Sequence, residues 1–276
     1  MNKIIPVNAS VTLFQAKSSL LNATVVENND SLLVIDTLLL PKDSKELYEF
    51  CLTKNKPVKY IINTHWHSDH CYGNRFFDHF NPIIIAHKLF WNTIEKEKNI
   101  IAPEKANIIN KKHLRLPHIT FSKDLELPEF NLVITHAPGH SDDSTRIYSQ
   151  LYDIYWTGDN VLNSNDNRIA IPYFYWGNPQ ELLSELRSLA KKKPNIIIPG
   201  HGLPCDYHKL DRDVSYLENL LLSFSKLSSS CSNQKLPSLI ECYPTQENDS
   251  FWVEKMHSLN LERLGGSSFS APALLS

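Results

Sequence analysis

Three histidines and one aspartate fall within six positions of this 276-residue chain, in the run His-Trp-His-Ser-Asp-His at residues 65–70. An apolar run at 58–62 directly precedes them and predicts a strand. In an extended backbone, side chains two positions apart face the same side, so His65 and His67 can converge on one cation. A turn after Ser68 then directs the aspartate and the third histidine toward a second point. Because no hydrophobic core requires such a cluster, the run indicates a metal site at a strand end.

Two metal ions need more ligands than one loop supplies, and three later apolar runs end in suitable side chains. His140 follows Pro-Gly, Asp159 follows Gly, and His201 follows Pro-Gly. The glycines point to the same places. The chain has only eight, and five of them lie within three residues of a candidate ligand: Gly73, Gly139, Gly158, Gly200 and Gly202. Because glycine is used where the backbone turns tightly or approaches another group closely, these positions predict close packing around the site.

In this order the motifs resemble those of the metallo-β-lactamase-fold hydrolases, over about residues 20–205. The resemblance implies an α/β fold, a four-layer αβ/βα sandwich with the metal ions at the edge where the loops of two sheets meet. It also implies how the ligands are shared. The first ion would be held by His65, His67 and His140, the second by Asp69, His70 and His201, and Asp159 would bridge them. The retained aspartate and the lack of a cysteine ligand look more like glyoxalase II and the lactonases than like the β-lactamases that name the fold.

The ligand types determine the chemistry that the resemblance implies. Neutral imidazoles and carboxylates with open positions suit zinc, and iron or manganese can also occupy such sites, so we expect two Zn2+ ions per chain. Two neighbouring cations lower the pKa of a shared water from about 15.7 toward 7, which makes hydroxide available at neutral pH. The expected enzyme is a dinuclear zinc hydrolase whose metal-bridging hydroxide attacks a small ester, thioester or lactone. Its candidate catalytic residues are Asp69, which can orient the nucleophile, and Asp159.

Three other functions stay open on the sequence. A persulfide dioxygenase of the same superfamily would use a single iron ion. A β-lactamase-like amide hydrolase would use similar ligands, but the N-terminal segment lacks the continuous apolar core of an export signal. A catalytically silent binding protein would be expected if ligands had been lost, whereas all seven are present.

Four consecutive aromatic residues follow the aspartate motif: Tyr173, Phe174, Tyr175 and Trp176. Successive side chains of an extended segment alternate between its two faces, so we expect at least some of these rings to be exposed. We predict that they line the substrate pocket and supply an apolar wall beside the polar ligands. The alternative is a packing plug beneath the C-terminal helices.

The rest of the pattern predicts alternating strands and helices. The expected elements are a hairpin of 20–27 with 32–36, helices at about 44–54, 88–98 and 179–192, and helical stretches near 210–227 and 247–264. We expect residues 1–210 to form the hydrolase domain and residues 211–276 to form a helical extension packed on it.

Composition limits the partners. Twenty-eight basic and thirty acidic side chains give a net charge of −2, so no basic field is available for a nucleic-acid backbone. No stretch approaches the roughly 18 to 20 apolar residues of a membrane span. The five cysteines lack CxxC spacing and are expected to be free thiols. We therefore expect a cytoplasmic protein with a small-molecule substrate and with no nucleic-acid or membrane partner, and the sequence leaves its oligomeric state open.

Overall fold

The structure is a computed structural model that describes most of the chain. The described residues are 2–17, 19–91, 114–164, 170–229, 236–243 and 251–265. They form two compact units. One contains the chain up to His136 together with Asp143–Leu151, and the other contains Ala137–Asp142 and the chain from Tyr152 through the last helix.

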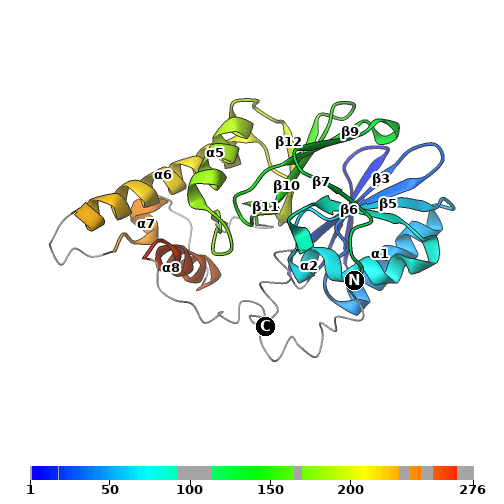
Figure 1. Cartoon of the computed structure of the whole chain (residues 1–276), viewed down its shortest axis with the longest axis horizontal. Coiled ribbons are helices and arrows are strands. Elements are labelled where there is room, and N and C mark those ends of the chain that lie inside the picture. The colour runs from blue at the N-terminus through cyan, green and yellow to red at the C-terminus, as the bar shows by residue number, and fades with distance from the viewer. Residues whose placement is uncertain are drawn as a thin grey trace. The chain divides into compact units, whose positions relative to one another are not determined.

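The first unit contains a seven-stranded sheet whose strands follow one another in sequence order (Figure 1). They are β1 Lys3–Pro6, β2 Val11–Gln15, β3 Asn22–Glu27, β4 Leu32–Ile35, β5 Val58–Ile62, β6 Ile83–His87 and β7 Ile119–Phe121. Strands β1 to β4 are antiparallel neighbours, and β4 to β7 are parallel. The β3–β4 pair confirms the predicted hairpin. The sequence pattern does not predict β1 and β2, because polar residues and a proline interrupt their apolar runs.

Parallel neighbours need crossover connections. Helix α1, Pro41–Thr53, connects β4 to β5, and helix α2, Ser68–Cys71, with the 3-10 helix η1, Tyr72–Phe80, connects β5 to β6. Helix α1 begins earlier than the predicted start at Ser44, because Pro41 supplies a first helical residue with its φ already fixed. The Ser44 hydroxyl instead donates to the carbonyl of Thr37 at 2.9 Å. Leu47 and Cys51 face the core one turn apart.

The five-stranded sheet has the order β12-β11-β10-β9-β8. Its strands are β8 Asp124–Leu127, β9 Leu132–His136, β10 Thr145–Ser149, β11 Ile154–Leu162 and β12 Ile196–His201, with the 3-10 helix η3, Pro128–Phe130, between β8 and β9. The last two strands are parallel, and helix α5, Pro179–Ala190, lies between them in the chain. The side chain of Asn178 caps α5 by accepting from two backbone N–H groups, as the Asn-Pro signal predicts.

Three helices follow the last strand (Figure 1): α6 Tyr207–Ser229, α7 Leu239–Cys242 and α8 Phe251–Gly265. Helix α6 packs against α5 and α7. It begins at Tyr207, so the proposed domain boundary at 210 lies inside a helix, and the division into residues 1–210 and 211–276 stays a prediction.

Two sheets with helices confirm the expected α/β class. The helix predicted near 88–98 lies almost entirely outside the described residues. Among the helices that the structure describes, none combines the length and the apolar character that crossing a bilayer demands.

Candidate metal centre

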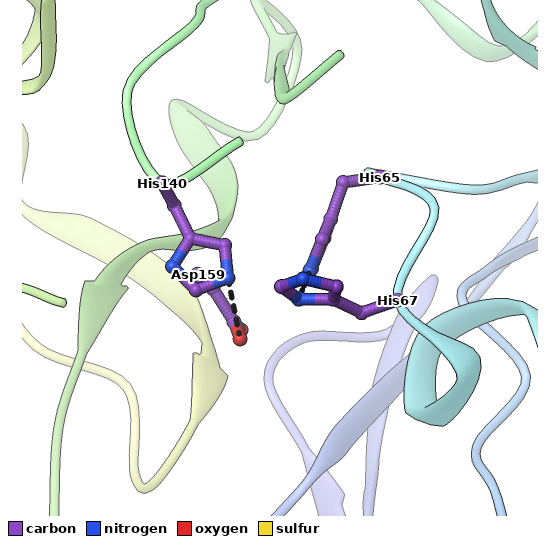
Figure 2. Close-up of side chains that lie close together, drawn as sticks. All are labelled: His65, His67, His140 and Asp159. Carbon is purple, nitrogen blue, oxygen red and sulfur yellow. Dashed lines mark hydrogen bonds and ion pairs between the residues drawn. The ribbon is translucent and has the colours of Figure 1, made fainter. Parts of the chain in front are cut away.

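The loop after β5 brings two imidazoles of the first unit together. His65 is buried and His67 is half-buried, and Nε2 of His65 lies 2.9 Å from Nδ1 of His67 (Figure 2, dashed line). The two rings therefore present different nitrogens to one point. Two neutral imidazole nitrogens at this separation can face the same cation, as the i, i+2 spacing predicts.

Asp36, directly after β4, anchors this loop. Its carboxylate accepts hydrogen bonds from the backbone N–H and the hydroxyl of Thr64, at 2.8 and 2.7 Å, and from Nδ1 of His70 at 2.8 Å. The Thr64 oxygen in turn lies 3.1 Å from Nδ1 of His65. Asp36 thus holds His70 directly and His65 through Thr64. Both rings keep their proton on Nδ1, which leaves Nε2 as the nitrogen for a metal ion.

Sequence reasoning missed Asp36, since the ligand count does not require it. The residue follows the apolar run of β4 as the candidate ligands follow theirs, and this position was the available signal. Strands β4 and β5 are parallel neighbours in register, with Ile35 opposite Ile62, so the residues after both strands emerge side by side. Burial raises the pKa of the Asp36 carboxyl, and the neighbouring His70 opposes that rise.

Helix α2 presents Asp69 and His70. Oδ2 of Asp69 lies 4.0 Å from Nε2 of His70, and Asp69 is half-buried. The carbonyl of His70 accepts from the backbone N–H of Thr37 at 2.9 Å and from the side chain of Asn63 at 3.2 Å. These bonds fix the start of the helix, so that the carboxylate and the imidazole are held at its first turn.

In the second unit, one carboxylate lies between two imidazoles. Oδ2 of Asp159, in β11, is 3.6 Å from Nε2 of His140 and 3.6 Å from Nε2 of His201, at the end of β12. Figure 2 shows the first of these pairs. Neighbouring ligand atoms around a tetrahedral zinc ion are about 3.3 Å apart, given bonds of 2.0–2.1 Å. A separation of 3.6 Å therefore suits atoms that share an ion better than a direct hydrogen bond.

Backbone groups orient His140. Its Nδ1 lies 2.6 Å from the carbonyl oxygen of Tyr173, and because a carbonyl can only accept, Nδ1 carries the proton. Its backbone N–H donates to the side chain of Asn160 at 2.9 Å. Nε2 is therefore the ring nitrogen left for a metal ion, as it is in His65 and His70.

Gly200 shows why glycine adjoins the ligands. A Cβ at this position would lie 1.8 Å from Oδ1 of Asp159 and 3.0 Å from the carbonyl carbon of Gly158. Any side chain at residue 200 would therefore displace the carboxylate. This contact agrees with the close packing that the glycine positions predict.

The aromatic segment is more buried than the alternation argument suggests. Tyr173 is 7% exposed, Phe174 is fully buried, Tyr175 is 5% exposed, and only Trp176 is half-buried. The segment packs against the loop after β9 that carries His140, because a Cβ on Gly177 would lie 2.0 Å from the carbonyl oxygen of Gly139. Burial raises the pKa of Tyr173. Both faces of the segment are covered, which an alternating pattern alone does not reveal.

Two groups of the described side chains could each hold a metal ion: His65, His67, His140 and Asp159, and Asp69, His70 and His201. They comprise all seven residues that the motifs select. Imidazole nitrogens and carboxylate oxygens accept zinc, iron or manganese.

Comparison with known proteins agrees with this set of candidate metal ligands. The profile of the Metallo-beta-lactamase superfamily matches residues 20–201. Lactamase-like protein nscB of Arthroderma gypseum is 27% identical over 185 residues, which cover 66% of this chain and 50% of that protein. Hydroxyacylglutathione hydrolase GloC of Haemophilus influenzae is 28% identical over 155 residues, 52% of this chain and 69% of that protein. The chain thus spans half the length of the first relative and about two thirds of the second.

Solved structures show the same fold. A metallo-beta-lactamase from Pontibacter korlensis aligns with a TM-score of 0.65 at 17% identity, over 79% of this chain and all of that one. DIM-1 metallo-beta-lactamase aligns with a TM-score of 0.64 at 17% identity, over 79% of this chain and 97% of that one. At this identity the likeness concerns the fold alone. With the superfamily profile matched over more than half of its length, the chain belongs to the metallo-beta-lactamase superfamily.

Proposed function

We propose that this chain is a metal-dependent hydrolase that holds two metal ions, zinc in the first instance, and cleaves a small ester, thioester or lactone. The observation that carries the proposal is the position of Asp159, whose Oδ2 lies 3.6 Å from the ligand nitrogens of both His140 and His201. A buried carboxylate oxygen at the same distance from the nitrogens of two imidazoles has the chemistry of a bridging ligand.

Ligand counting supports two shared ions. Catalytic zinc sites use three protein ligands and leave a position open for water or substrate. Each pair from the first unit, His65 with His67 and Asp69 with His70, is one ligand short of that number. His140 and His201 would complete the two sets, with Asp159 common to both.

The residues have separate tasks in this proposal. The candidate ligands would hold two ions, which would supply a bound water of lowered pKa and would polarise the substrate carbonyl. The carboxylate of Asp69 accepts a hydrogen bond from the attacking water and so orients it. Asp36 keeps the proton of His70 on Nδ1, and the carbonyl of Tyr173 does the same for His140. The slightly negative net charge of −2 agrees with a small-molecule substrate, and we place the reaction in the cytoplasm.

A thioester is the substrate class to test first. GloC, the relative with 69% of its length matched, is named as a hydroxyacylglutathione hydrolase, and such a substrate is an acyl thioester. The ligand set also lacks cysteine, so no thiolate competes with the substrate sulfur for an ion.

Hydrolysis by zinc-loaded protein of S-acyl glutathione thioesters, lactones, β-lactams and aryl phosphodiesters tests the proposal, with oxygen uptake on glutathione persulfide measured in parallel. We expect thioester or lactone cleavage that chelation abolishes and zinc restores. Asp69→Asn should lower kcat by at least about 100-fold. Asp78→Asn is the matched control, because Asp78 pairs only with the exposed Arg115 among the described contacts. Cleavage of none of these substrates by fully loaded protein, or oxygen uptake alone, would contradict the proposal.

A further inference from the structure

A side chain of the last helix forms hydrogen bonds with the segment that orients His140. Asn260, in α8, is fully buried. Its Oδ1 accepts from the backbone N–H of Phe174 at 3.2 Å, and its Nδ2 donates to the carbonyl of Pro172 at 2.8 Å. One amide makes both bonds in a single orientation only, so the two contacts fix each other. The peptide groups on either side of Tyr173 are held as a neighbouring strand would hold them.

The carbonyl of Tyr173, between these two contacts, is the acceptor for Nδ1 of His140 at 2.6 Å. A rotation of the Tyr173 peptide would withdraw that acceptor and let the imidazole turn or change tautomer. Partners of this kind orient metal-binding histidines and raise their basicity. The bonds therefore run from α8 through residues 172–174 to the ring of His140.

Asn260 is itself fixed by a hydrogen-bond network with Tyr216 and His257. Its Nδ2 also donates to the hydroxyl oxygen of Tyr216 at 3.1 Å, and that hydroxyl lies 3.0 Å from Nδ1 of His257. Nε2 of His257 lies 3.0 Å from the carbonyl of Pro237, which can only accept. Nε2 therefore carries the proton, and Nδ1 accepts from Tyr216. Each of these groups is thereby assigned as a donor or an acceptor, so the hydrogen-bond network has a single pattern of donors and acceptors.

A second contact joins the same helix to the same segment. Arg263 donates to the carbonyl of Gly177 at 3.1 Å. Gly177 lies directly against Gly139 and His140, where even a methyl group would not fit. Helix α8 thus holds both ends of the aromatic segment.

We propose that Asn260 is a positioning residue for the metal ligand His140, acting through the backbone of residues 172–174. The inference rests on the proposed metal centre. It makes α8, which lies in the C-terminal extension of the predicted domain scheme, a working part of the site. A purely structural role for the Asn260 network would stabilise the fold without changing how an ion is bound.

Zinc affinity separates these two roles. The affinity of each ion is measured by competition with a chromophoric chelator, and the absorption spectrum of the Co2+-loaded protein reports the ligand geometry. Asn260→Ala should weaken one of the two ions by about 10- to 100-fold and alter the Co2+ spectrum. Leu259→Ala is the matched control, because Leu259 is the adjacent buried residue of α8 and its side chain is apolar. It should lower Tm as well, yet bind both ions as the wild type does.

Wild-type affinities or an unchanged spectrum in Asn260→Ala would overturn the inference, and so would an equal loss in Leu259→Ala. Tyr216→Phe covers the case in which Asn260→Ala does not fold, since it removes only the hydroxyl behind Asn260. It should weaken the same ion at least about threefold, and an unchanged affinity would also overturn the inference. A wild-type protein that binds no zinc would instead refute the proposed metal centre, so the two failures are distinguishable.

Discussion

Gly200→Ala places the smallest possible obstacle against the proposed bridging carboxylate. The new Cβ would lie 1.8 Å from Oδ1 of Asp159, and ordinary contact begins at 3.4 Å. The carboxylate or the strand must therefore shift by at least 1.6 Å, the difference between these two distances. The next obstacle, the carbonyl carbon of Gly158, is 3.0 Å away and requires a much smaller adjustment. Most of the strain should thus fall on the functional end of one side chain.

A misplacement of about 1 Å can cost roughly 100-fold in rate, so kcat/KM of Gly200→Ala should fall by at least that factor. Overpacking of this kind costs about 1–3 kcal/mol of unfolding free energy, or a decrease in Tm of roughly 2–12 °C for a chain of this size. Thermal unfolding of metal-free protein and hydrolysis by zinc-loaded protein measure the two effects.

A double-mutant cycle identifies the cause. In an Asp159→Ala background the carboxylate is gone, so Gly200→Ala should cost much less unfolding free energy than it does in the wild type. Equal costs in both backgrounds would refute the reasoning, as would a Gly200→Ala protein with wild-type zinc affinity and rate.

Three further predictions concern single side chains. Asp159→Ala should lose mainly one ion and most of the turnover, because two cations repel without the carboxylate between them; elemental analysis that finds both ions with full hydrolysis would disprove bridging. Burial lowers the pKa of His87, which stacks on His136 at 3.8 Å, to about 4. The unfolded chain, with a pKa near 6.5, binds the proton first, so stability should fall by up to about 3 kcal/mol as pH drops from about 6.5 to 4. Urea unfolding should show this loss diminished in His87→Gln, and an equal loss would exclude His87 as its cause. Phe174→Ala should cost about 3–5 kcal/mol of stability, whereas Trp176→Ala should mainly raise KM; equal Tm losses with unchanged kinetics would remove the aromatic segment from the substrate pocket.

The sequence reveals the candidate ligands because each stands directly after an apolar run. The motif at 65–70 follows β5 and His201 ends β12, as a strand-end position predicts, whereas Asp159 lies inside β11 and His140 comes four residues after β9. Asp36 occupies an equivalent position, but its role depends on β4 and β5 being parallel neighbours in register. Strand pairing depends on the tertiary structure, and the local hydrophobic periodicity of the sequence does not predict it.

The hydrogen bonds that orient His140 could not be predicted from the sequence. Asn260 contacts a segment 86 residues away, and a single asparagine in a helical pattern gives no sign of such a partner. The aromatic segment shows the same limit, because alternation describes two faces and says nothing about whether both are covered. Close backbone approach was predicted in part: Gly200 is one of the five glycines that the sequence singles out, and a Cβ there would collide with Asp159, whereas Gly177, which the sequence does not single out, makes an equally close approach to Gly139.

The number of metal ions per chain tests the central claim most directly. Protein purified without chelators, saturated with Zn2+ and then freed of unbound metal is analysed for zinc and for protein in the same sample. The seven candidate ligands predict close to two tightly held ions per chain. A reproducible value near zero, with zinc unable to rebind, would contradict the metal centre, and saturation at one ion would contradict the bridging role of Asp159.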